Sequence, residues 1–280
     1  MPAAGLVLTA IVSIQIGAAL AVGLFSEVGA GGAVFLRAAT AAAVLLVLWR
    51  PGLPREARSR WMILLFGVAL AGVNLGFYEA IDRIPLGTAV TFEFTGPLAV
   101  ALITSRRRRD WIWAGLAAIG ILLLTGGVGG DQLDLVGVAF ALGAGVCWAG
   151  YILIGTRLGA ESVGGGPLAL SLVVSAVLLA PSGIGAGGVD LLRPEVLALG
   201  LAVGMLSAAI PFSLELEAMR RLPANVFGVL MSLEPAVAAV VGLVLLGQGI
   251  GLAQAVAITF VVVASAGALY SGREPARVEP

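Results

Sequence analysis

Four ionisable side chains lie inside long apolar stretches of the sequence, where a charge is costly. Arg37 stands about six residues into one stretch, and Glu93, Glu215 and Glu234 stand in others. A charged side chain at the centre of a bilayer costs about 2.5–3.5 kcal/mol on insertion scales, so each needs a reason to be there. A guanidinium can hold a carboxylate through two hydrogen bonds, and intramembrane carboxylates often belong to proton relays. These four residues are therefore candidates for binding a small charged molecule or moving protons.

Each of these residues also has a purely structural interpretation. Arg37 binds either a substrate carboxylate or a fixed carboxylate partner within the protein. Glu93 and Glu234 either act on substrate and protons, or stay neutral and hydrogen-bond neighbouring helices. The sequence contains no histidine, so carboxylates would have to carry any proton exchanged near neutral pH. Glu93 and Glu234 are therefore the proton-coupling candidates, and Glu215 is a further unpaired carboxylate.

Uncharged polar and aromatic side chains add candidates for lining a binding site. Asn74 and Tyr78 are four residues apart and Trp148 and Tyr151 three apart, so each pair shares one helical face. For the aromatic pair, core packing is the alternative. Thr91 lies in a row of threonines, a residue type whose hydroxyl commonly bonds its own helix instead. The candidate substrate-binding residues are Gln15, Arg37, Asn74, Tyr78, Thr91, Glu93, Trp148, Tyr151, Glu215 and Glu234.

The elements that must position these residues are predicted to be membrane-spanning helices. Hydrophobic residues make up 60% of the 280 residues and charged residues only 11%, whereas soluble domains carry roughly 25% charged residues. The apolar runs are about twenty residues long, the length that crosses a hydrocarbon core of about 30 Å. They cover residues 5–26, 31–49, 61–82, 85–105, 111–127, 133–156, 164–182, 195–219, 223–246 and 249–271. We therefore expect an all-α membrane protein with ten transmembrane helices.

The distribution of arginine orients these helices. All sixteen basic residues are arginine. When the N-terminus is placed in the cytoplasm, thirteen of the sixteen fall in cytoplasmic segments, Arg83 and Arg193 fall outside, and Arg37 lies within a helix. Cytoplasmic loops carry an excess of positive charge, so both termini are predicted to be cytoplasmic. The arginine run 106–109 is interpreted as an anchor at the anionic inner leaflet and not as a nucleic-acid site.

An internal repeat divides the chain in half. Residues 78–99 align without gaps to residues 216–237, at an offset of 138 residues. The matching pairs are Glu79 and Glu217, Ala80 and Ala218, Arg83 and Arg221, Pro85 and Pro223, and Pro97 and Pro235. The Glu-to-Arg spacing of four residues in both copies predicts a repeated ion pair at a helix end, and contact of Glu79 and Glu217 with substrate is the alternative. Five helices per half is an odd number, so the second half must insert inverted, as in transporters that hold substrate near the membrane midplane.

The repeat also relates the two proton-coupling candidates. Glu234 corresponds to Gly96, which is about one helical turn from Glu93. Both carboxylates are therefore expected to face the shared interior between the halves. Pro97 and Pro235 are expected to kink their helices and to free backbone carbonyls beside this site.

Three stretches resemble the EamA-type transporters of the drug/metabolite transporter superfamily: FYEAIDRIPLGTAVTFEFTGPLAVALITSRRRRD, GAGVCWAGYILIGTR and LEAMRRLPANVFGVLMSLEPAVAAVVGLVLLG. Within this superfamily the chain is most similar to threonine/homoserine exporters. The resemblance covers essentially the whole chain. It implies two inverted five-helix repeats around a central cavity, at residues 1–130 and 131–272, followed by a short cytoplasmic tail at 273–280. One departure is Gln248, where the family commonly has Glu, so no charge acts at that position.

The resemblance implies a secondary transporter of the bacterial inner membrane that exports small neutral amino acids or related metabolites by alternating access. A broader exporter of drugs or metabolites and a non-transporting scaffold subunit are the alternatives. An enzyme would need a catalytic cluster, and the sequence has no histidine and a single cysteine, Cys147. The expected partners are a small-molecule substrate and the lipid bilayer, with no cofactor, metal or nucleic acid. The oligomeric state, a homodimer included, stays open.

Overall fold

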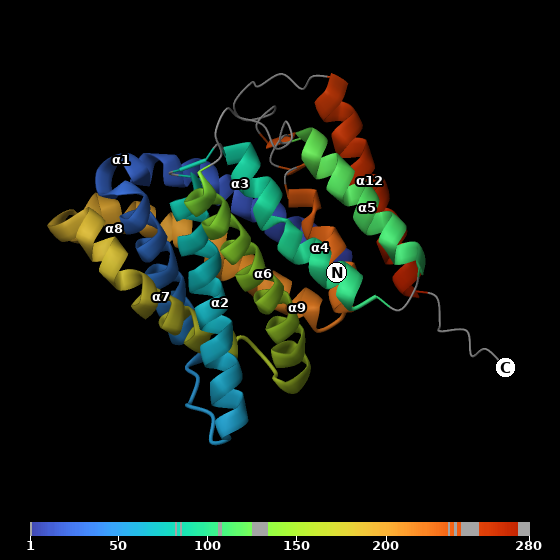
Figure 1. Ribbon diagram of the computed structural model, residues 1–280. Coiled ribbons are helices and arrows are strands. Elements are labelled where there is room, and N and C mark those ends of the chain that lie inside the picture. The colour runs from blue at the N-terminus through green and yellow to red at the C-terminus, as the bar shows by residue number, and fades with distance from the viewer. Residues whose placement is uncertain are drawn as a thin grey trace.

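The apolar runs fold as helices in the computed structural model, which describes residues 2–81, 83–84, 86–105, 108–124, 134–234, 236–237, 240–241 and 252–273. Within these ranges the regular secondary structure is helical and no strand occurs. The helices lie side by side in one bundle (Figure 1). The all-α fold class is therefore confirmed.

The elements of the bundle have the following bounds. In chain order they are α1 (Ala3–Trp49), α2 (Ala57–Ile81), α3 (Leu86–Glu93), α4 (Thr95–Ile103), α5 (Arg108–Leu124), α6 (Leu135–Glu161), α7 (Gly166–Gly187), the 3-10 turn η1 (Gly188–Leu192), α8 (Pro194–Gly204), the π-helical turn η2 (Met205–Ala209), α9 (Ile210–Met219), α10 (Ala224–Met231) and α12 (Leu252–Arg273).

The first element, α1, consists of two helical arms that meet at Gly29. This residue has φ +69° and ψ 172°, a conformation that glycine adopts at little cost and other residues rarely adopt. The break predicted between residues 26 and 31 falls at this position. Figure 1 shows α1 changing direction at the upper left of the view, so its two arms approach the rest of the bundle separately.

Five helical segments are long and apolar enough to cross a membrane. They are Gly23–Trp49, Ala57–Ala80, Leu135–Glu161, Gly166–Leu192 and Pro194–Met219. Large apolar side chains such as Trp61, Val146 and Val177 are exposed on the outside of the bundle. Soluble proteins rarely expose contiguous apolar surface on this scale, whereas lipid covers it. The chain is therefore a multi-pass membrane protein.

Segments related by the 138-residue offset have matching bounds. Residues 57–81, which form α2, match residues 195–219, which lie in α8, η2 and α9. Both segments end in the same turn: Ala80 O accepts hydrogen bonds from the amides three and four residues later, and Ala218 O accepts the same pair, all at 2.9 Å. The next helices, α3 at 86–93 and α10 at 224–231, then match residue for residue.

A short interruption follows each of these two matching helices. It falls at Phe94 after α3 and at Ser232 after α10, again 138 residues apart. Pro97 explains the first, because it has no N–H for the carbonyl of Glu93 four residues earlier and its ring crowds that carbonyl. The predicted kink at Pro97 is therefore seen as a break three residues before the proline. Pro235 itself lies outside the described residues.

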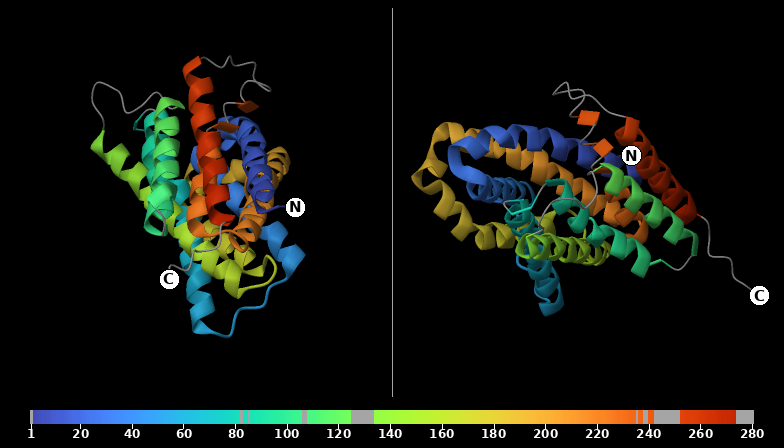
Figure 2. Two further views of the ribbon diagram at one scale, coloured as in Figure 1. Left: turned by 90° about the vertical axis from the view of Figure 1, so that its right-hand side faces the viewer. Right: turned by 45° about the horizontal axis from the view of Figure 1, so that its top comes forward.

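The helices pack closely where small residues meet. α1 packs against α7 and α8, α2 against α6 and α7, and α5 against α12, which lie side by side at one end of the bundle (Figures 1 and 2). A Cβ atom at Gly72 of α2 would overlap Sγ of Cys147 in α6, and one at Gly96 of α4 would overlap the carbonyl oxygen of Gly145 in α6. The spacing of α6 from α2 and α4 thus depends on the absence of side chains at these glycines.

Candidate functional site

A cavity of about 740 Å³ lies at the centre of the bundle, bordered by α1, α2, α3, α6, α8, α9 and the chain around α10. Ligand pockets commonly measure about 300–1,000 Å³, so this space can hold a small metabolite. Its lining includes Gln15, Arg37, Asn74, Tyr78, Glu93, Trp148, Tyr151, Glu215 and Glu234. These are nine of the ten candidate residues; the side chain of the tenth, Thr91, lies outside the described part of the structure, as does Gln248.

Arg37 projects from the second arm of α1 and is held by neutral groups. Its Nη1 donates to Oδ1 of Asn74 at 3.0 Å, and its Nη2 donates to the carbonyl oxygen of Ser207 at 3.0 Å. The guanidinium carbon lies 5.5 Å from the centre of the Phe212 ring, a cation–π contact. Among the described residues no carboxylate forms an ion pair with Arg37. The guanidinium is thus fixed in place by hydrogen bonds to neutral groups.

The carbonyl of Ser207 is available to Arg37 because of a proline. In an α-helix this oxygen would accept from the amide four residues later, but that residue is Pro211, which has no N–H. The helix widens here into η2, where the amide of Ile210 bonds the carbonyl of Met205 five residues back. Asn74 is positioned in turn, since its Nδ2 donates to the carbonyl of Leu70 at 2.6 Å. Two neighbouring elements therefore aim oxygens at one guanidinium.

Both arms of α1 contact the π-helical turn. From the first arm, Ser13 Oγ donates to the carbonyl of Leu206 at 2.5 Å, and a Cβ at Gly17 would lie 2.7 Å from Cβ of Ser207. From the second arm, Arg37 donates to the carbonyl of Ser207, and Thr40 Oγ1 lies 3.0 Å from the carbonyl oxygen of Gly200 in α8, just before the turn. The η2 turn is thus enclosed by packing as well as by the Arg37 hydrogen bond.

Glu93 and Glu234 line the cavity at the ends of two matching helices. Glu93 is the last residue of α3, and its side chain is 6% exposed. Glu234 follows the interruption after α10 and is half-buried. The structure shows no hydrogen bond or ion pair from either carboxylate to another described residue. They interact electrostatically with each other, and Glu234 also interacts with Arg37.

Glu215 of α9 has a more constrained environment. Its Oε2 accepts a hydrogen bond of 2.6 Å from the hydroxyl of Tyr151, and the residue is only 1% exposed. Its Oε1 is buried and accepts no hydrogen bond from any residue that the structure describes. Glu217, two residues further on, instead pairs with arginines outside the cavity. Two positions of one helix, separated by a single residue, thus hold one cavity carboxylate and one ion-paired carboxylate.

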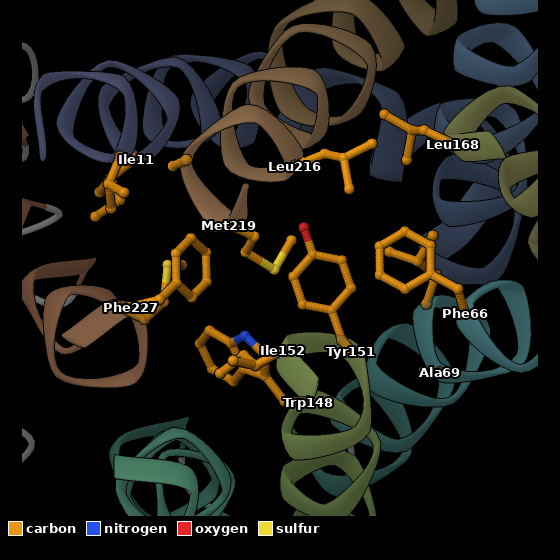
Figure 3. Close-up of a cluster of buried hydrophobic side chains, with 14 of the residues drawn as sticks. Ile11, Phe66, Ala69, Trp148, Tyr151, Ile152, Leu168, Leu216, Met219 and Phe227 are labelled. Atoms are coloured by element: carbon orange, nitrogen blue, oxygen red, sulfur yellow. The ribbon is translucent and has the colours of Figure 1, made fainter. Parts of the chain in front are cut away.

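Aromatic side chains form one wall of the cavity. Tyr151 stacks on Phe66 with ring centres 4.9 Å apart and an angle of 14°, and Trp148 meets Phe94 edge-on at 4.8 Å. Figure 3 shows Tyr151 between Phe66 and Met219, within the largest buried cluster. The two interpretations of the Trp148 and Tyr151 pair are therefore not exclusive, since both residues pack in the core and line the cavity.

A second aromatic group borders the cavity further along α1 and α2. Tyr78 meets Phe25 and Phe77 edge-on, with ring centres 6.0 and 6.1 Å apart. Phe25 lies four residues before Gly29, on the first arm of α1. The aromatic groups around Tyr78 and Tyr151 thus add apolar surface to the cavity that the charged residues line.

The predicted ion pairs at the helix ends are confirmed. Arg83 bonds Glu79 at 2.6 Å, and Arg221 bonds Glu217. The second copy carries an addition that the pattern did not predict: Arg220 also bonds Glu217, at 2.7 Å, and donates to two backbone carbonyls, those of Gly159 and Gly164. These contacts tie α9 to the connection between α6 and α7.

Some residues of the site had escaped the sequence reasoning. Phe212 and Ser207 both hold Arg37, and Met231 lines the cavity at the position that matches Glu93. A signal for Ser207 was present, because Pro211 stands four residues later and must leave that carbonyl without a helical donor. Phe212 and Met231 gave no signal, since apolar residues inside apolar helices look alike.

Known proteins resemble this chain over most of its length. A model of the EamA-like transporter family matches residues 135–270. The threonine/homoserine exporter RhtA of Escherichia coli (strain K12) is 45% identical over 276 residues, which cover 98% of this chain and 93% of that protein. The protein of the same name from Salmonella typhimurium (strain SL1344) is 46% identical over 271 residues, covering 96% and 92%.

More distant relatives agree with these matches. The uncharacterized transporter YwfM of Bacillus subtilis (strain 168) is 28% identical over 217 residues, which cover 74% of this chain and 72% of that protein. A solved crystal structure superimposes with a TM-score of 0.79 over 97% of this chain and 99% of the other. Its sequence identity of 21% makes it a match of fold alone.

Proposed function

This chain belongs to the EamA-like transporter family, and we propose that it exports threonine, homoserine or similar small neutral amino acids across the bacterial inner membrane. The observation that carries the proposal is the polar set within the cavity. Arg37, without an ion-pair partner among the described residues, shares the cavity with three glutamates. Such groups are costly in an apolar bundle unless a ligand or a proton uses them.

Arg37 is the residue that we assign to the substrate carboxylate. A guanidinium has five N–H donors, and the hydrogen bonds to Asn74 and Ser207 use one on each terminal nitrogen. The donors that remain can hold a carboxylate, and the fixed geometry lowers the entropy lost on binding. Glu93 and Glu234 are the groups that we assign to coupling with a proton gradient.

The architecture that we propose for transport has ten membrane-spanning helices in two inverted repeats, at residues 1–130 and 131–272, with both termini in the cytoplasm. The two arms of α1 would be the first two helices, α3 with α4 the fourth, and α8 with α9 the eighth. The matching bounds of residues 57–93 and 195–231 support a duplicated unit. Substrate would sit where the repeats meet, and rocking of one repeat against the other would open the cavity to each side alternately.

Efflux from loaded cells tests this function. Cells that express the protein are preloaded with labelled threonine or homoserine, and release is followed with and without a proton gradient. We expect release faster than in cells with an empty vector, and a dependence on the gradient that Glu93→Gln or Glu234→Gln reduces. If both variants left efflux and its pH dependence unchanged, the coupling role would be abandoned.

The same experiment distinguishes the two alternatives. Efflux of many unrelated compounds, with weak competition by threonine, would identify a broad drug or metabolite exporter. No efflux of any compound from a panel, despite normal membrane insertion, would identify a scaffold subunit. Either outcome would contradict the proposed function.

A further inference from the structure

Glu215 stands apart from the other cavity carboxylates because one of its oxygens is fixed and the other is not. The hydroxyl of Tyr151 donates to Oε2 at 2.6 Å, and Tyr151 is itself held by its stack on Phe66. Oε1 is buried and has no hydrogen-bond partner among the described residues. A buried carboxylate oxygen without a donor is unfavourable, so the site is suited to a ligand that brings N–H groups.

The protein does not provide a cation for this oxygen within its described residues. The nearby arginines 220 and 221 bind Glu217, and the sequence contains no lysine or histidine. Arg37 interacts with Glu215 electrostatically but makes its hydrogen bonds to neutral groups. A positive group able to contact Oε1 directly would therefore have to come from the substrate.

The position of Glu215 relative to Arg37 suits a molecule with two opposite charges. The Arg37 guanidinium lies over the ring of Phe212, which is three residues before Glu215. Residues three apart on a helix share a face, with about 5–6 Å between their Cβ atoms. The anion-binding guanidinium therefore lies against a residue one helical turn from the cation-binding Glu215, and both groups line the same cavity.

We propose that Glu215, oriented by Tyr151, binds the α-ammonium group of the transported amino acid while Arg37 binds its carboxylate. This inference rests on the proposed function and makes it more specific. It restricts the substrate to molecules with a free amino group, so a hydroxy acid or an N-acylated amino acid is a poor ligand. Glu93 and Glu234, for which the structure shows no orienting hydrogen bond from a described residue, are not assigned to this contact.

Binding to the purified full chain in lipid nanodiscs tests the assignment. The two ligands are L-threonine and 2,3-dihydroxybutanoate, which carries a hydroxyl in place of the ammonium group. We expect the wild-type protein to bind threonine at least about 30-fold more tightly, the effect of removing one partner of a buried charge pair. In Glu215→Gln, which can still accept from Tyr151, threonine affinity should fall to the level of the hydroxy acid, whose affinity should change less than about 3-fold.

Glu217→Gln is the matched control, because it removes the same charge from the same helix outside the cavity. It should leave both affinities within about 3-fold of wild type. If Glu215→Gln does not fold, Tyr151→Phe carries the test. It removes the hydroxyl that orients Glu215. In the efflux assay it should raise KM for threonine about 3- to 10-fold with kcat unchanged, and in the binding assay it should weaken the preference for threonine over the hydroxy acid.

Three outcomes would overturn the inference. An equal loss of affinity for both ligands in Glu215→Gln or Tyr151→Phe would show a structural role. Loss of the preference in Glu234→Gln but not in Glu215→Gln would move the ammonium contact to Glu234. Threonine efflux by the wild type together with equal binding of both ligands would refute recognition of the amine, and absence of any amino-acid efflux would refute the proposed function as well.

Discussion

Two regions of the molecule, α2 to α4 and α8 to α10, have the same backbone plan and different chemistry. The ends of α2 and α9, and both ends of α3 and α10, lie at matching positions 138 residues apart, and each region has the same turn and the same interruption. Three pairs of cavity-lining residues also occupy matching positions, but their types differ. The matched pairs are Asn74 and Phe212, Phe77 and Glu215, and Glu93 and Met231. The two regions therefore share a backbone arrangement, whereas a charged residue in one region faces the cavity where the other region has an uncharged residue.

The regions also differ in one feature of the backbone. α2 is helical throughout, whereas its counterpart widens into η2. The cause is local, because Pro211 stands where α2 has Val73 and deprives Ser207 of its helical hydrogen bond. Arg37 binds the freed carbonyl, and its own counterpart in the repeat is Ser175. A single proline in one copy and a single arginine in the other thus make the site asymmetric.

The largest expected effect comes from removing that arginine. Arg37→Gln should lower kcat/KM for threonine efflux at least about 100-fold, since the substrate carboxylate would lose its only fixed cation within the described cavity. Initial efflux rates over a range of internal threonine concentrations measure this. Arg193→Gln, which removes an exposed arginine paired with Glu27 and Glu195, is the control and should change the rate less than about 2-fold. A similar decrease in both variants would contradict the assignment.

The second expected effect concerns Gly96, which stands in the first region where the second region has a glutamate. Gly96 corresponds to Glu234 but packs against the backbone of Gly145, which leaves no room for a Cβ. Gly96→Ala should therefore lower the free energy of unfolding by about 1–3 kcal/mol. Gly143→Ala, on the open face of α6, meets no atom within 4 Å and should be neutral or stabilising by up to about 1 kcal/mol. Thermal unfolding of both variants in the same detergent decides; equal midpoints would refute the close packing.

The third substitution would make the two regions more alike. Pro211→Ala restores an N–H that can bond Ser207, so α9 should become more regular and the free energy of unfolding should rise by about 1 kcal/mol. Arg37 would then share that carbonyl with the helix, and threonine efflux should fall about 3- to 10-fold. Unfolding and efflux are measured on the same variant, and stability should rise while the efflux rate falls. If both quantities rose, or both fell, the widened turn η2 would not be needed for transport.

The smallest expected effect compares the two ion pairs. Glu217 binds both Arg220 and Arg221, whereas Glu79 forms an ion pair with Arg83. Glu217→Gln should therefore lower the free energy of unfolding by up to about 1 kcal/mol and Glu79→Gln by less than about 0.5 kcal/mol, because these pairs are partly exposed to solvent. The difference should shrink in high salt. An unchanged difference at high salt would argue against an electrostatic origin.

Much of the fold could be predicted from the sequence, because helix length and the repeat are periodic signals. The break at Gly29, the helix ends near Ile81 and Met219, and the paired arginines follow directly from residue type and spacing. The break near Pro97 was predicted as a kink and lies three residues earlier, because the proline disrupts the hydrogen bond of the preceding turn.

The detail of the site was less predictable for a physical reason. Charged residues in apolar helices are conspicuous, so Arg37 and the three glutamates could be identified as a set. Which of them interact depends on helix rotation and separation, which periodicity does not determine. The hydrogen bond of Tyr151 to Glu215 joins residues 64 positions apart, and the Phe212 contact depends on the widened turn. Such contacts depend on tertiary structure.

The crossing of α2 and α6 has a practical consequence. The only cysteine in the sequence, Cys147 of α6, has its sulfur against Gly72 of α2. Cys147 is partly buried, so any opening of that crossing would expose its thiol further. The rate of maleimide labelling should therefore report movement of α2 against α6 in the unmodified protein, without an introduced probe.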